Sequence, residues 1–100
     1  MEKEDWFYIR DFIKSILVSV QSELDEESVN SVNHYLEYDE FEMAFEGLFI
    51  EMMNLKIPPK IDFLKSKEVA KQLKMDEESV FDFEFWRKFE DFISRNTDAI

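Results

Sequence analysis

The chain has 100 residues with 24 acidic and 12 basic side chains, so its formal net charge at pH 7 is −12. Its 45% hydrophobic and 16% aromatic content exclude a disordered chain and suffice for one core. No Cys means no disulfide or thiolate chemistry, and one Gly excludes a phosphate-binding loop. The negative charge makes nucleic acid a poor partner, because phosphate repels carboxylate. We therefore expect a single all-α domain over residues 1–100, since helices joined by short turns need little glycine.

Apolar periodicity predicts a bundle of about five helices, beginning with two in the first 37 residues. The first runs from about Asp5 to Val20 and has a main apolar stripe. Phe7 and Val18 lie on a second side, and a helix that is apolar on two sides is expected to be central to the bundle. The second helix runs from about residue 25 to 37, with Asp25 as its N-cap.

The third helix is expected to start at Asp39, because Glu42 stands three residues later with the spacing of a capping box. Pro58 and Pro59 end it, since proline lacks the backbone N–H and disfavours helix before it. Its inner stripe is predicted to contain Phe41, Ala44, Phe45, Leu48, Phe49, Met52 and Leu55.

The last two helices are predicted at about residues 60–73 and 76–93. Leu64 is expected inside the fourth helix's apolar stripe and Phe63 outside it. Phe81 to Phe85 alternate with acids as a strand would, but the 3.6-residue pattern that follows favours a helix beginning at Asp76.

No residue constellation indicates an enzyme, a cofactor or a metal. The single histidine, His34, is expected on the surface of the second helix, and no serine stands at triad spacing from it. Glu42 and Glu46 lie one helical turn apart, but they lack the Glu-x-x-His partners of helical metal sites. We therefore predict a non-catalytic protein.

The acidic residues are unevenly distributed. The 41 residues between Lys14 and Lys56 contain no Lys or Arg and ten acids. Charges of one sign in so long a stretch repel one another and destabilise the folded protein. We therefore expect a basic partner whose charges relieve this repulsion. On the third helix, opposite the core stripe, acids are mixed with apolar side chains that suit either a protein interface or a contact with a neighbouring helix: Glu42, Met43, Glu46, Ile50 and Met53.

The segment VNHYLEYDEFEMAFEGL at residues 32–48, followed by Ile57-Pro58, resembles small bacterial toxin-immunity proteins, namely the MafI-type family and the immunity proteins of contact-dependent growth inhibition. The resemblance implies an antitoxin that binds and neutralises a cognate secreted toxin domain, frequently a basic nuclease. An acidic inhibitor can cover the toxin's substrate groove, and opposite charges accelerate association. The resemblance identifies a scaffold better than a binding surface.

The predicted partner-binding residues are Asp25, Glu26, Glu27, Tyr35, Glu37, Tyr38, Asp39, Glu40, Glu42 and Glu46. Their carboxylates would pair with Lys or Arg of the toxin, and the tyrosines would add contact area, although Tyr35 also fits the helix core. Two other readings stay open: a nucleic-acid mimic that inhibits DNA- or RNA-binding enzymes, and a helical adaptor or homo-oligomer. Neither a leader sequence at Met1–Trp6 nor a membrane span is evident, so we expect a soluble cytoplasmic protein.

Overall fold

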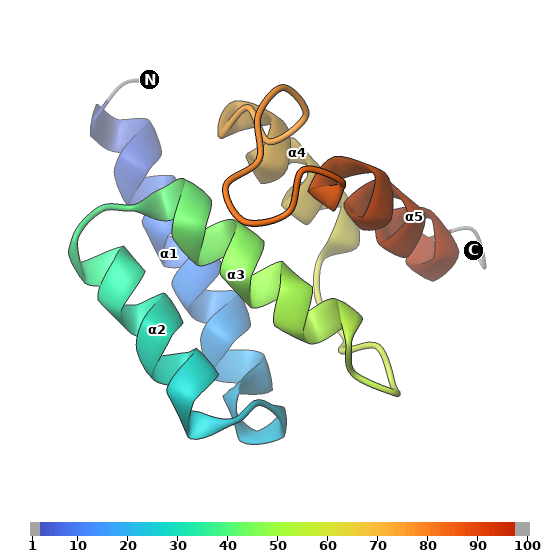
Figure 1. Cartoon of the computed structure of the whole chain (residues 1–100). Helices are drawn as coiled ribbons and strands as arrows, with labels where there is room; N and C mark the ends of the chain where they lie inside the picture. The colour runs from blue at the N-terminus through green and yellow to red at the C-terminus, as the bar shows by residue number, and fades with distance from the viewer. Residues whose placement is uncertain (1–2, 98–100) are drawn as a thin grey trace.

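The computed structural model confirms an all-α fold in which one helix lies between two pairs of helices (Figure 1). The structure describes residues 3–97, so Met1 and Glu2 of the predicted leader-free N-terminus lie outside it. Within that range there are five α-helices, one short 3-10 turn at Gln21–Glu23 and no strand. The helices are α1 (Lys3–Val20), α2 (Glu26–Glu37), α3 (Phe41–Met53), α4 (Phe63–Gln72) and α5 (Phe85–Thr97).

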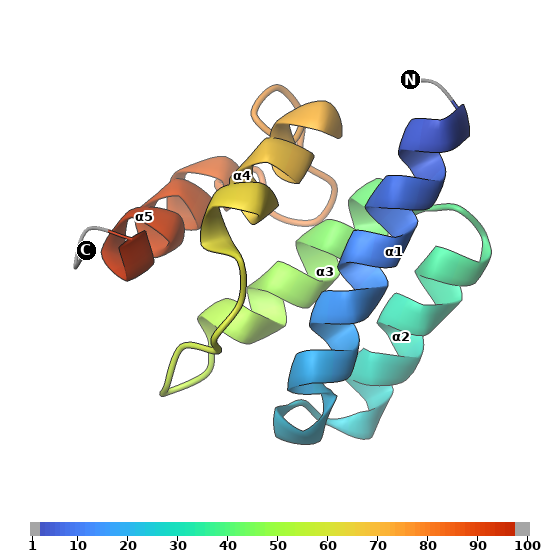
Figure 2. The ribbon, with the colours of Figure 1, turned by 180° about the vertical axis from the view of Figure 1, so that it is seen from behind.

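The central helix is α3, not the first helix as predicted. α3 packs against α1, α2 and α5, and Phe45, Phe49 and Phe89 form a cluster with ring centroids 4.5–5.6 Å apart. The main stripe of α1 is buried as expected, but Phe7 and Val18 on its second side are exposed, because α1 lies at the back of the molecule with its second side uncovered (Figure 2). The seven buried residues of α3 are Phe41, Ala44, Phe45, Glu46, Leu48, Phe49 and Met52.

Asp25 caps α2 as predicted, whereas the capping box expected for α3 is wrong. The Ser28 backbone N–H donates to Oδ1 of Asp25 at 2.7 Å. Asp39 instead ends α2: its φ is 58°, a left-handed conformation that closes helices, and its N–H donates to the carbonyl of Leu36. α3 therefore begins at Phe41, without a side-chain cap, and it ends at Met53, before the two prolines.

α4 is shorter than predicted and turned differently. Its N-cap is Asp62, whose Oδ1 accepts the backbone N–H of Lys65 at 3.0 Å. Leu64 is 67% exposed, so its assignment to the core was wrong. Phe63 was expected outside, but it packs against the core with its ring 5.6 Å from that of Phe92. The helix starts at Phe63, three residues later than predicted, and Phe63 instead of Leu64 faces the core.

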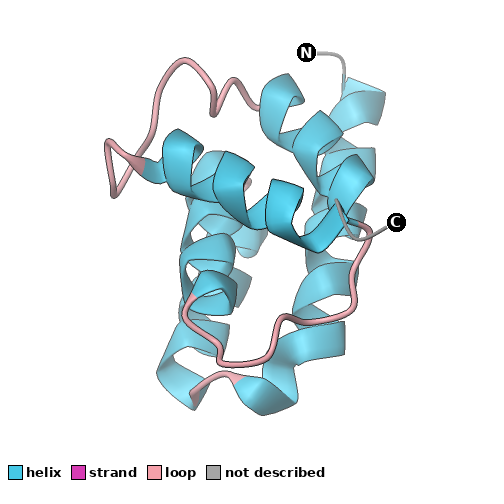
Figure 3. Ribbon diagram, turned by 90° about the vertical axis from the view of Figure 1, so that its right-hand side faces the viewer, coloured by secondary structure: helices cyan, strands magenta, loops and turns pink. Residues whose placement is uncertain are grey.

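The fifth helix begins at Phe85 and not at Asp76, so residues 73–84 form a long irregular connection (Figure 3). We call it the 73–84 segment. Lys74, with φ of 59°, turns the chain out of α4, and Met75 is buried. Val80 and Phe81, which lie within the helix predicted to begin at Asp76, are exposed and not helical. Neither the helix nor the strand reading of residues 81–84 was correct.

Candidate partner-binding surface

Helix α2 and the turn after it carry most of the predicted contact acids on the surface. At the start of α2, Asp25, Glu26 and Glu27 are exposed, and they stabilise the helix because its N-terminus carries partial positive charge. At its other end the exposed acids are Glu37, Asp39 and Glu42, and Glu40 is half-buried. Since α2 has 12 residues, the two groups stand about 18 Å apart along it.

Glu46 is the exception: it is 0% exposed, so its prediction as a surface contact is wrong. Its carboxylate accepts three backbone N–H groups of the 73–84 segment. Oε1 accepts from Val80 at 2.7 Å, and Oε2 accepts from Phe81 at 2.7 Å and from Asp82 at 2.8 Å. The charge is thus compensated by aligned peptide dipoles, and none of the ion pairs among the described residues involves Glu46.

The residues that flank Glu46 on this side of α3 are covered by the C-terminal half of the chain. Met43 lines a hollow together with Leu73 and Val80, while Ile50 and Met53 pack against the core beside the start of α5. Contact with a neighbouring segment thus accounts for part of this face, and the three apolar side chains remain half-buried. Only Glu42 of the set is exposed.

The two predicted tyrosines have different environments. Tyr38 is exposed, and its ring lies 4.8 Å from that of the exposed His34. Tyr35 is half-buried and packs partly against the core, with its ring 6.1 Å from that of Phe81. The alternative reading of Tyr35 as a core residue is thus partly correct. Its contact with Phe81 joins α2 to the 73–84 segment.

Two hollows lined by carboxylates lie on either side of the Val80–Phe81 pair. The Glu27 hollow, of about 360 Å³, is lined by Asp25, Glu27 and Glu51, with Tyr35 and Phe81. The Glu42 hollow, of about 630 Å³, is lined by Asp39, Glu40, Glu42 and Glu78, with Lys74 and Val80. The acids therefore gather in two groups, separated by apolar side chains of a segment that the sequence predicted to be helical.

Hydrogen bonds to Ser28 keep the pKa of Asp25 below its ordinary value of 3.8, first through the side chain and then through the backbone N–H. The Ser28 hydroxyl has one proton, and its geometry directs that proton to Oε1 of Glu51 at 2.9 Å. The backbone N–H is therefore the steady donor to Asp25. At this rim of the Glu27 hollow, the carboxylate stays ionised to lower pH than a free aspartate.

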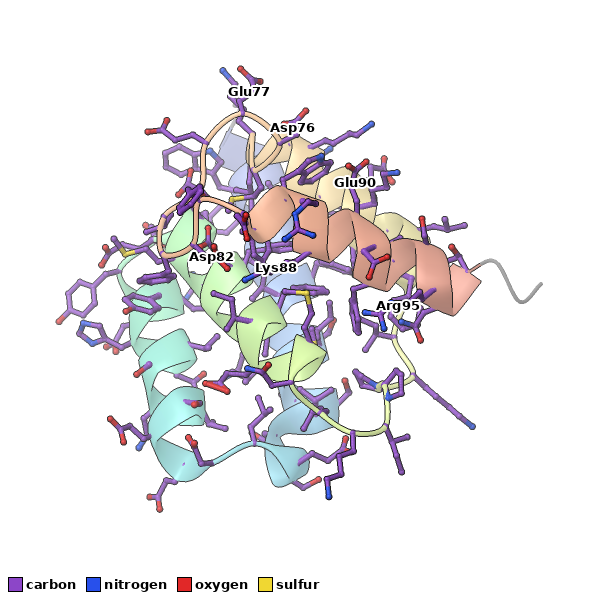
Figure 4. The ribbon with its side chains drawn as sticks, turned by 45° about the vertical axis from the view of Figure 1, so that its right-hand side comes forward. Asp76, Glu77, Asp82, Lys88, Glu90 and Arg95 are labelled. Carbon is purple, nitrogen blue, oxygen red and sulfur yellow. The ribbon has the colours of Figure 1, made fainter. Side chains whose placement is uncertain are left out.

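Asp82 joins the 73–84 segment to α5. Its side chain accepts the Lys88 Nζ at 2.7 Å and the Glu84 backbone N–H at 2.9 Å. These bonds, the one from Lys88 first, lower the pKa of Asp82 from 3.8. Figure 4 shows Asp82 and Lys88 beside each other at the start of α5, whereas Asp76 and Glu77 stand at the outer end of the segment. Asp82 thus has a structural role, and Glu78 is the acid that the segment contributes to the Glu42 hollow.

Comparisons with known proteins give no family: no protein-family model matches the sequence, and no curated protein or solved structure matches it significantly. In residues 3–97, no group of three or more His, Asp or Glu side chains is arranged to hold a metal ion. None of the helices described is both long enough and apolar enough to cross a membrane. The candidate site is therefore defined by its own geometry, an acidic surface with an apolar centre.

Proposed function

We propose that this protein is an immunity protein that neutralises a basic toxin domain by binding it stoichiometrically through the acidic surface of α2 and the α2–α3 turn. The observation that carries the proposal is that the acids of this surface form no ion pair among the described residues. The ion pairs among the described residues all lie between Lys67 and Arg95, so no Lys or Arg stands within 4.0 Å of a carboxylate of α2 or α3.

An uncompensated field of this size favours association with a cationic surface. Like charges that face solvent repel each other, and a partner's Lys and Arg side chains would relieve that repulsion while forming charge-assisted hydrogen bonds. Nuclease domains present such cationic surfaces because they bind phosphate. The protein would act in the cytoplasm of the cell it protects, without catalysis of its own.

The experiment is to purify the product of the neighbouring gene with and without this chain, and to measure binding by calorimetry and protection of cells that express the toxin. A one-to-one complex that weakens as salt increases supports the proposal. Absence of a complex, or no protection, contradicts it. Inhibition of several unrelated nucleases would instead identify a nucleic-acid mimic.

A pair of charge-matched variants tests which surface is used. Glu26→Lys with Glu27→Lys reverses two exposed charges at the start of α2. Asp11→Lys with Glu68→Lys makes the same change in net charge at exposed positions of α1 and α4. The first pair should slow association at least about 10-fold more than the second, since steering depends on charge near the contact. Equal effects would mean that only net charge matters and that α2 is not the binding surface.

A further inference from the structure

Among the large hydrophobic side chains of the described residues, the most exposed one lies on the 73–84 segment. Phe83 is 92% exposed, and its neighbours Val80 and Phe81 are 42% and 51% exposed. We call residues 80–83 the 80–83 loop. Isolated exposed apolar residues are common on proteins, but three within four residues form an apolar patch of the kind found at protein interfaces.

This loop is held in one conformation although it is irregular. The buried Glu46 accepts the N–H groups of Val80, Phe81 and Asp82, and Asp82 in turn accepts Lys88 and the N–H of Glu84. Backbone that is already ordered loses little conformational entropy when a partner binds. Flexible loops with exposed phenylalanine would instead collapse onto the nearest apolar surface.

The charges around the loop indicate what kind of partner fits. Val80 lines the Glu42 hollow and Phe81 lines the Glu27 hollow, so carboxylates flank the loop on both sides. Residues 75–85 contain five acids; Asp82 and Glu84 form ion pairs with Lys88 and Arg87, which leaves Asp76, Glu77 and Glu78 without an ion pair among the described residues. An apolar surface of this charge is repelled by acidic proteins and by anionic membranes, and it is complementary to an apolar recess bordered by Lys or Arg.

We propose that the 80–83 loop is the apolar anchor of the interface: Phe83 and Phe81 enter a recess on a basic protein whose Lys and Arg side chains occupy the Glu27 and Glu42 hollows. This inference rests on the proposed function and names the element that slows dissociation. The acids set the rate of association, and the buried aromatic side chains set the lifetime of the complex.

The test compares Phe83→Ala with Ile57→Ala in binding to the neighbouring gene product, measured by surface plasmon resonance. Ile57 is a matched control because it is 77% exposed on another loop. Phe83→Ala should raise the dissociation rate by about 30-fold or more and leave the association rate within about 2-fold. Ile57→Ala should change neither. Because Phe83 is nearly fully exposed, its replacement leaves the fold intact, which circular dichroism checks.

A second variant tests the role of the anchored conformation. Glu46→Gln changes a buried residue that no partner can touch, yet it removes the hydrogen bond to Val80 and weakens those to Phe81 and Asp82. It should weaken binding at least about 5-fold at a temperature where the variant remains folded, through the entropy of ordering the loop. Binding equal to that of wild type would overturn the anchoring part of the inference.

The outcomes separate the inference from the proposed function. If the wild-type chain binds its partner and Phe83→Ala binds equally well, the loop is not the anchor, although the acidic surface remains. If the wild-type chain binds no such partner, both proposals fail. If sedimentation shows that the chain self-associates and Phe83→Ala makes it monomeric without affecting the complex, the loop is a contact between copies, and the inference is wrong.

Discussion

Replacing Glu46 by Gln should destabilise the protein by about 3 kcal/mol, although the side chains have the same shape. The oxygen that remains can keep the N–H groups of Phe81 and Asp82 in the place of Oε2. The new NH₂ group then faces the N–H of Val80, donor against donor, and that bond is lost. Bonds to a charged acceptor contribute about 1.5–3 kcal/mol and bonds to a neutral one about 0.5–1.5 kcal/mol.

Losing the bond to Val80 costs about 2 kcal/mol, and weakening each of the two remaining bonds costs about 1 kcal/mol. The exposed loop regains part of this free energy, about 1 kcal/mol, by forming hydrogen bonds with water. For a domain of this size the midpoint of thermal unfolding, measured by far-ultraviolet circular dichroism, should fall by about 15 °C. Amide hydrogen exchange of Val80, Phe81 and Asp82 should accelerate more than that of the α3 core, because the loop opens locally.

The control is Glu42→Gln, one turn earlier on the same helix and exposed. It makes the same chemical change and should alter the free energy of unfolding by less than about 0.5 kcal/mol. If Glu46→Gln also stays within that range, then the three backbone bonds contribute nothing net and the account of the 73–84 segment is refuted.

Three further changes test other parts of the structure. Gly47→Ala should raise the free energy of unfolding by about 0.5–1 kcal/mol in urea titrations, because alanine favours helix and its Cβ would stand at an ordinary contact distance, 3.8 Å, from the Phe81 ring. A lower free energy of unfolding would show that the ring lies closer. Asp25 and Asp82 have pKa values lowered from 3.8, so the stability that their carboxylates contribute is fully present above that pH and is lost as the pH falls through the lowered values. Replacing both by Asn should therefore lessen the drop in thermal midpoint between about pH 6 and pH 3. An unchanged drop would contradict this. Lys74→Gly should stabilise by about 1 kcal/mol, because a φ of 59° strains side chains other than glycine, and a lower thermal midpoint would argue against that strain.

The fold class and the helices up to Met53 could be predicted because local signals and packing agree there. The cap at Asp25 is present as expected, and so is the core stripe of α3 except for Leu55, which lies beyond the end of the helix and is half-buried. Asp39 misled because the same residue types suit a helix start and a left-handed helix end, and sequence spacing does not distinguish them. The site was predicted correctly only in that most of its acids are on the surface.

The 73–84 segment could not be predicted, because a contact distant in the sequence decides its conformation. Residues 76–84 have an acidic start and apolar spacing that favour a helix, and a local pattern carries no information on a carboxylate more than thirty positions away. Glu46 looked like an exposed acid for the same reason. One feature of the sequence did indicate that Glu46 could be buried. It directly follows Phe45 in a helix whose residues are mostly apolar, so few positions of that helix can face solvent.

Glu46 holds the 80–83 loop solely through main-chain amides, which every residue except proline possesses. The side chains at positions 80, 81 and 83 take no part in the hydrogen bonds to Glu46, although the Phe81 ring also packs against Tyr35. A lineage can exchange them one at a time and alter what the molecule recognises while the scaffold stays fixed. Proline at 80, 81 or 82 is the one replacement this arrangement forbids.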